Sequence, residues 1–217
     1  MPFTPTTRRA AALAVALTAA AFGPTRAARA QFVTDPAGDF LPTYVGPRNG
    51  DMDVIRAAFT FDGTAYHFTS RSAGSLGTTA GALFVWGVDR GQGTARFGAL
   101  APGVLFDAVV VVDPFGTTTV RDLISGAATT LPVGAVRFSG ADLFADVSAA
   151  LLPSLGFTAS QYTANLWPRV GAGNTAISDF APDNSNIAVT ATPEPATLLL
   201  VLPAMAAVAV VRRRRAA

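Results

Sequence analysis

The chain has 217 residues, half of them hydrophobic, with 16 arginines, no lysine, 13 aspartates, a single glutamate, one histidine and no cysteine. Residues 31–191 hold eight of the arginines and all thirteen aspartates, a net charge of −5, so the basic residues in excess lie at the two ends. An acidic folded part argues against a nucleic-acid partner, and the lack of cysteine excludes disulfides and thiolate metal sites.

Residues 1–30 predict an export signal. Arg8 and Arg9 precede an apolar stretch over 10–22, and Ala28-Arg29-Ala30 has the small-x-small pattern of a cleavage site. We therefore expect the secretion machinery to carry the chain across the inner membrane, and the mature protein to begin at Gln31. General secretion is the favoured route, and the arginine pair leaves twin-arginine export as the alternative.

Residues 31–191 predict one antiparallel β-domain. The segment is rich in Gly, Thr, Val and Phe, has turn signals at short intervals and lacks a long 3.6-residue hydrophobic pattern. Its length of about 160 residues is sufficient for a core without disulfides. We expect an all-β fold, a β-sandwich or jelly roll of about eight to ten short strands with at most one short helix.

The clearest predicted hairpin covers residues 53–72. Alternating apolar residues from Ile55 to Phe61 share one face, and Asp62-Gly63 predicts a two-residue turn. The same register turns His67 outward, where we expect it to be solvated. Further along, the nearly continuous apolar runs over 81–88 and 103–112 predict central strands.

Two local signals complete the predicted domain. A turn is expected at Ser139-Gly140 between two further strands. Residues 146–155 predict the one short helix, with Asp146 or Ser148 as its N-cap and Pro153 at its end.

Aspartates gather before the first predicted strand and again near the end of the domain. Asp35, Asp39, Asp51 and Asp53 form the first group, and residues 179–186 contribute Asp179, Asp183 and further amide and hydroxyl oxygens. Calcium takes six to eight oxygen ligands from flexible loops, so we predict a structural calcium site at the first group. The alternative is that Asp and Asn are present here as turn formers.

Two tryptophans are candidates for glycan contact. Trp86 is followed by Asp89 and Arg90 in a glycine-containing loop, and Trp167 precedes Pro168-Arg169. Indole rings stack on sugar faces while neighbouring polar groups bind the hydroxyls. Burial of both indoles in the core is the competing interpretation.

No catalytic residue is predicted. With one histidine and no cysteine, a zinc site would need aspartate ligands almost exclusively, and a Ser-His-Asp triad would depend on His67 without a nucleophile elbow. A polysaccharide-active enzyme that uses a pair of aspartates remains the alternative function.

The last 26 residues combine three features. Pro193-Glu194-Pro195 is extended by its prolines, residues 196–211 are apolar, and Arg212, Arg213, Arg214 and Arg215 follow. As a helix, residues 196–211 would be about 24 Å long, somewhat short of the ~30 Å hydrocarbon core. We expect a transmembrane helix here, with the arginines in the cytoplasm and residues 31–191 outside.

This order of motif, apolar stretch and arginines resembles the PEP-CTERM sorting signal of Gram-negative bacteria that make extracellular polysaccharide. The resemblance covers residues 192–217 and implies that an exosortase, a membrane-embedded cysteine protease, cuts near Pro193-Glu194-Pro195. It further implies a membrane-anchored precursor that is delivered to the cell surface or the extracellular matrix.

The domain itself resembles uncharacterised exported β-sandwiches in the stretches "DPAGDF", "FVWGVDRGQG" and "NLWPR". It is more distantly similar to the DOMON and family 9 carbohydrate-binding sandwiches, which implies a capacity to hold sugars or haem. Together, the two resemblances predict a non-enzymatic surface or matrix protein that is structural or contacts extracellular polysaccharide.

Overall fold

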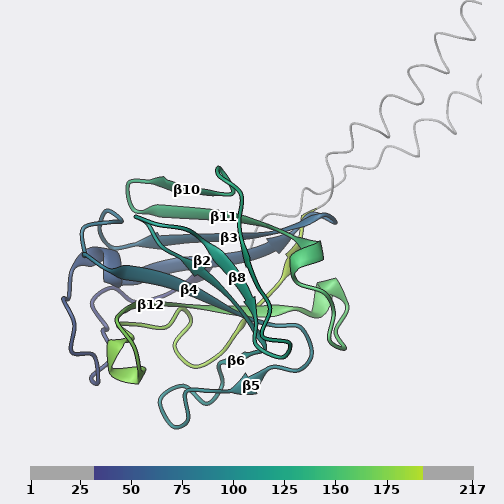
Figure 1. Cartoon of the computed structure of the whole chain (residues 1–217). Coiled ribbons are helices and arrows are strands. Elements are labelled where there is room, and N and C mark those ends of the chain that lie inside the picture. The colour runs from purple at the N-terminus through teal and green to yellow at the C-terminus, as the bar shows by residue number, and fades with distance from the viewer. Residues whose placement is uncertain (1–31, 193–217) are drawn as a thin grey trace, which may run out of the picture.

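The computed structural model describes residues 32–192 (Figure 1). The predicted signal peptide, the Pro-Glu-Pro motif, the transmembrane helix over 196–211 and the arginine cluster lie outside these residues. Within residues 32–192, no helix has both the length and the apolar character needed to cross a membrane.

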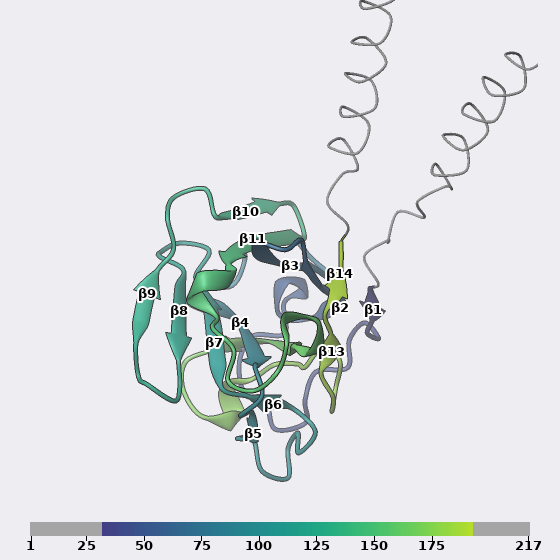
Figure 2. The same cartoon turned by 90° about the vertical axis from the view of Figure 1, so that its right-hand side faces the viewer.

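The described chain is all-β, as the sequence predicts, and forms two six-stranded sheets that face each other (Figures 1 and 2). The first sheet has the order β1 (Val33–Thr34), β2 (Val54–Phe61), β3 (Ala65–Ser72), β11 (Asp142–Ser148), β10 (Val136–Ser139), and β14 (Thr190–Ala191) also pairs with β2. The second has the order β13 (Ile187–Ala188), β12 (Thr163–Val170), β4 (Ala82–Asp89), β7 (Ala108–Val112), β8 (Thr119–Asp122), β9 (Ala128–Thr130).

Shorter elements complete the fold. Strands β5 (Thr94–Ala95) and β6 (Leu105–Phe106) pair with each other beside the second sheet. The helical elements of the described chain are single 3-10 turns: η1 (Gly50–Met52), η2 (Ala149–Leu151), η3 (Ala159–Gln161) and η4 (Asn174–Ala176). All strand pairs are antiparallel except β14 with β2.

The main core fills the space between the sheets. Phe59 and Phe68 stack across β2 and β3 with ring centroids 4.8 Å apart, and Phe68 contacts Trp86 of the opposite sheet at 5.3 Å. All three side chains are fully buried. Alternation along β2 and β3 sends these rings inward, which is the pattern that the sequence predicts for this hairpin.

A second core covers the outer face of the second sheet. Trp167 of β12 packs against Phe97 and Phe106, with ring centroids 4.9 and 5.0 Å away, and Phe180 completes the cluster. Strand β4 therefore has buried side chains on both faces, which explains its nearly continuous apolar sequence. Gly87 lies under Trp167, and an added Cβ would come within 2.6 Å of the indole ring.

The two ends of the described chain meet at one edge of β2. Strand β1 pairs with Ala57 and Arg56, and β14 pairs with Thr60 and Phe61 (Figure 2). Just before β14, strand β13 pairs with β12 of the other sheet. Residues 187–191 thus join both sheets and close the sandwich on this side.

Three local predictions need correction. The β2–β3 connection has three residues, because the Asp62 carboxylate accepts the backbone N–H groups of Thr64 and Ala65. Strand β11 extends to Ser148, so the predicted helix shrinks to the single turn η2, which Ser148 caps. The run over 103–112 is divided into β6 and β7 at Asp107.

Candidate metal centre

Five aspartates from three distant segments converge near the edge that closes the sandwich. Asp35 and Asp39 lie in the loop after β1, and Asp53 lies directly before β2. Asp179 and Asp183 lie in the connection between β12 and β13. We call these five residues the aspartate cluster.

The cluster consists of two groups of three that share Asp39. An outer group contains Asp35, Asp39 and the exposed Asp183, and an inner group contains Asp39 with the buried Asp53 and Asp179. Within each group, one carboxylate oxygen per residue lies within 4.8 Å of the others. That span is about twice a calcium–oxygen distance of ~2.4 Å, so one cation could reach all three carboxylates of a group.

Backbone hydrogen bonds hold the cluster in place. The Asp179 carboxylate accepts the N–H groups of Val54 at 2.9 Å and Phe180 at 2.7 Å. The N–H of Gly38 donates to Asp53 Oδ2 at 2.7 Å. The three segments are therefore fixed to one another through their carboxylates as well as through strand pairing.

Several carboxylate oxygens of the cluster have no hydrogen-bond partner among the described residues. They are Oδ2 of Asp35, Oδ1 of Asp39 and Oδ1 of Asp53, and all three atoms are buried. A buried carboxylate oxygen is costly to leave unpaired, since burial removes the water that would solvate it.

Burial and mutual repulsion raise the pKa of these carboxyls. Burial, followed by the charges of Asp39, Asp183 and Asp53, raises the pKa of Asp35 to about 7. Burial also raises the pKa of Asp179 to about 8, against the opposing effect of its bond from the Val54 N–H. The pKa of Asp39 is raised by burial as well. The site therefore favours positive charge, from protons or from a cation.

The structure brings together only part of the predicted calcium group. Asp35, Asp39 and Asp53 come together, but Asp51 is buried elsewhere and accepts hydrogen bonds from the N–H and hydroxyl of Thr79 at 2.7 and 2.6 Å. Asp179 and Asp183 lie beside the other three aspartates instead. In the sequence, the many oxygen-bearing side chains of residues 179–186 were the signal for Asp179 and Asp183. Only the tertiary structure shows that this segment meets the aspartates near the start of the domain.

The predicted glycan contacts through Trp86, Asp89, Arg90 and Trp167 are wrong. Trp86 and Arg90 are fully buried, Trp167 is 2% exposed and Asp89 is 7% exposed. The two indoles lie in the two hydrophobic cores, so neither ring face is available to a sugar. Both faces of the second sheet are covered, which brings the end of β4 inside the protein.

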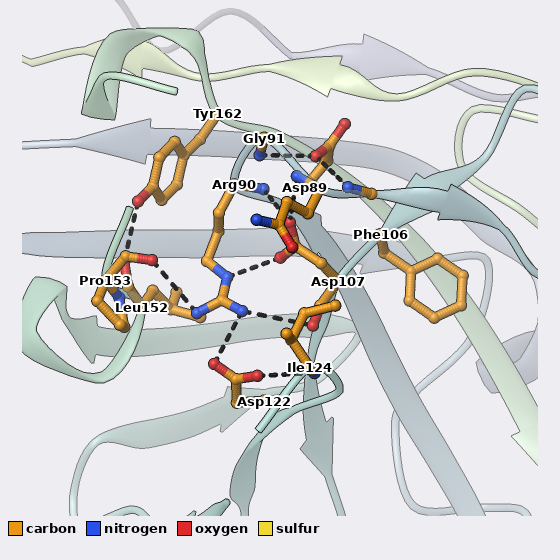
Figure 3. A network of polar contacts seen from close by, with 12 residues as sticks. Asp89, Arg90, Gly91, Phe106, Asp107, Asp122, Ile124, Leu152, Pro153 and Tyr162 are labelled. Carbon is orange, nitrogen blue, oxygen red and sulfur yellow. Dashed lines mark hydrogen bonds and ion pairs between the residues drawn. The ribbon is translucent and has the colours of Figure 1, made fainter. Parts of the chain in front are cut away.

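Arg90 instead organises a buried polar network (Figure 3). Its Nε donates to Asp107 at 2.7 Å and its Nη2 donates to Asp122 at 3.0 Å, while Nη1 donates to the Pro153 carbonyl at 3.3 Å. The Asp107 carboxylate also accepts the N–H groups of Arg90 and Gln92. Burial would lower the pKa of Arg90, but its bonds to Asp107 and Asp122 raise it, so the guanidinium stays charged.

His67 is paired rather than freely solvated. It lies on the outward face of β3, half-buried, with Nδ1 2.8 Å from Asp146 and Nε2 3.0 Å from Asp62. Burial lowers the pKa of His67, and the two carboxylates outweigh burial and raise it. Because both ring nitrogens are occupied, His67 is not positioned to serve as a general base.

Neither of two surface cavities touches the aspartate cluster. One, of about 230 Å³, lies between residues 113–118 and 131–138, and the other, of about 440 Å³, is lined by Phe61, Tyr66, Tyr162 and residues 149–159.

Comparison with protein-family models, curated proteins and solved structures finds no match for this chain. With no relative to compare, the site is interpreted from its own atoms. The aspartate cluster offers only carboxylate oxygens as ligand atoms, and these suit a hard cation.

The first prediction concerns Arg90. Substitution Arg90→Met leaves the fully buried Asp107 without its ion-pair partner, and we expect the free energy of unfolding to fall by about 3–5 kcal/mol. Urea unfolding followed by circular dichroism measures this. The double substitution Arg90→Met with Asp107→Leu should recover part of the loss. Equal losses in Arg90→Met and in Arg71→Met, whose ion pair with Asp142 is exposed, would contradict the prediction.

The second prediction concerns His67. Because its pKa is raised in the folded state, its ion pairs stabilise the fold fully below pH ~6.5, and this contribution is lost as the pH rises through the folded pKa. We expect His67→Gln to remove about 0.5–1 kcal/mol at pH 5.5 and much less at pH 8.5. Thermal unfolding of both proteins across this range measures the difference. A pH-independent difference would show that folding does not shift the pKa of His67, and would contradict the prediction.

Proposed function

We propose that this chain is an exported, non-catalytic β-sandwich protein that its C-terminal signal sorts to the cell surface or the polysaccharide matrix. The observation that carries the proposal is that the last hydrogen bond of the described residues lies directly before the motif. The Thr192 N–H donates to the Phe61 carbonyl at 2.8 Å, and Pro193 begins the motif at the next position. A cut at Pro193-Glu194-Pro195 would leave all described strands intact, as expected of a domain that carries a cleavable sorting signal.

The charge distribution supports the same topology. Residues 31–191 carry a net charge of −5, whereas the arginines at 8, 9 and 212–215 flank the two apolar stretches. In the proposed precursor, both arginine clusters stay on the cytoplasmic side and the acidic domain crosses the inner membrane. The partners are then the secretion machinery, the membrane and an exosortase.

Within this class, a structural role is better supported than glycan contact. Sugar binding commonly uses exposed aromatic rings, and both indoles are buried. The most exposed aromatic ring among the described residues is Phe115, at 68%, and we propose it as the first position to test for contact with extracellular polysaccharide.

A polysaccharide-active enzyme with paired aspartates is the rival function. One observation favours it: Asp35 has a pKa of about 7 and lies beside Asp39, so it could hold a proton at neutral pH as a general acid does. Release of reducing ends from candidate polysaccharides, abolished by Asp35→Asn, would support the enzyme. Absence of release supports the structural role.

The third prediction is the mass of the mature protein, measured by intact mass spectrometry of protein from cells and from medium. We expect a chain that begins at Gln31 and ends between Pro193 and Pro195, because the two prolines favour an extended motif that a protease can bind, and the motif directly follows the described strands. Deletion of the exosortase should leave the C-terminus intact in the membrane fraction.

The matched control changes the motif alone. Substitution Glu194→Ala should retain the unprocessed chain in the membrane fraction, whereas Gln92→Ala, on the domain surface, should leave processing unchanged. A mature protein that keeps Arg212–Arg215 in the presence of the exosortase would overturn the proposal and identify the tail as a lasting anchor.

A further inference from the structure

The aspartate cluster has negative charge without a positive partner. None of the ion pairs among the described residues involves Asp35, Asp39, Asp53, Asp179 or Asp183. Elsewhere in the domain, the fully buried carboxylate of Asp107 pairs with Arg90. Like charges within 4.8 Å of one another oppose folding unless protons or a cation neutralise them.

A second, independent feature is the orientation of Asp53. This residue is 5% exposed, its Oδ2 is held by the Gly38 N–H, and its buried Oδ1 has no partner among the described residues. Asp53 belongs to the inner group, in which Asp179 is 1% exposed and fixed by two backbone N–H groups. The backbone therefore holds buried carboxylates together, with an acceptor atom left over for a ligand.

We infer that the inner group, Asp39, Asp53 and Asp179, binds one calcium ion, and that the outer residues Asp35 and Asp183 close the site toward solvent. The donors are carboxylate oxygens from three loop segments, a supply that suits the six to eight ligands of calcium. Zinc prefers nitrogen and sulfur donors, and magnesium demands a near-ideal octahedron that loop carboxylates supply less readily.

The ion holds together the segments that lie near the two ends of the domain. Its ligands lie in the loop after β1, directly before β2, and in the connection that leads to β13 and β14. Strands β1, β13 and β14 have only two residues each, so strand pairing alone contributes few hydrogen bonds at this edge. Calcium therefore stabilises the edge at which residues 187–191 join the two sheets. This role goes beyond the proposed sorting and does not depend on it.

The test uses the mature protein isolated from cells, freed of metal with EDTA and returned to buffer by dialysis. Calcium chloride is titrated by calorimetry, and the melting temperature is measured with calcium and with EDTA. We expect one ion per chain and a rise in melting temperature of about 5–10 °C at saturating calcium. Magnesium at the same concentration should give a smaller rise.

Variants separate binding from a general effect on folding. Asp39→Asn and Asp53→Asn keep the shape of the side chain and remove one charge, so in EDTA they should melt at or above the temperature of the wild type. Both should lose the calcium response, Asp183→Asn should weaken it, and Asp142→Asn, whose partner is Arg71, should retain it.

Two results would overturn the inference. One is the absence of binding heat together with equal melting temperatures in calcium and in EDTA. The other is a calcium response that is unchanged in both Asp39→Asn and Asp53→Asn, which would place the ion elsewhere. Because all five aspartates lie within the domain and none in the C-terminal signal, failure of the proposed sorting would not alter these outcomes.

Discussion

Burial of β4 on both faces is the constraint on which the rest of the structure depends. Trp86 contacts the core between the sheets, while Val85 faces the second core, which Trp167 and Phe180 complete. A strand without a solvated face requires cover on its outer side, and β5, β6 and the connection after β12 supply it. Gly87 is needed there because the Trp167 ring lies directly over its Cα.

The end of β4 also carries a buried charge. Arg90 directly follows β4, is fully buried and therefore needs the carboxylates of Asp107 and Asp122. The bonds of Arg90 to the chain around Pro153 hold the loop after η2 against the same network. One buried cation thus organises the strand end, the β6–β7 break and a distant loop.

At the opposite side, the same domain brings carboxylates together without an arginine. The connection after β12 returns across the second core and delivers Asp179 beside Asp53. Backbone N–H groups partly compensate Asp179, and the remaining acceptors favour an external cation. The contrast between Arg90 and the aspartate cluster is a physical reason to expect that the stability of this edge depends on cations in the surrounding solution.

Periodicity and turn chemistry determined the local structure. The alternation of Ala57, Phe59 and Phe68 predicts the hairpin and its inward face, and the apolar run over 81–88 predicts a central strand, because both signals depend on neighbours along the chain. The patterns at the two termini likewise predict export and sorting, which no described residue tests.

Only the tertiary structure decided which distant residues meet. The same residue types, tryptophan beside a polar loop or aspartate in a turn, suit a surface site and a buried one equally well. Trp167 is a core residue because the outer face of its sheet is covered. Asp51 lies outside the aspartate cluster, and its carboxylate oxygens accept hydrogen bonds from Thr79 instead. Asp179 is held in the cluster by the N–H of Val54, which is 125 residues away in the chain, and local sequence patterns cannot specify such a contact.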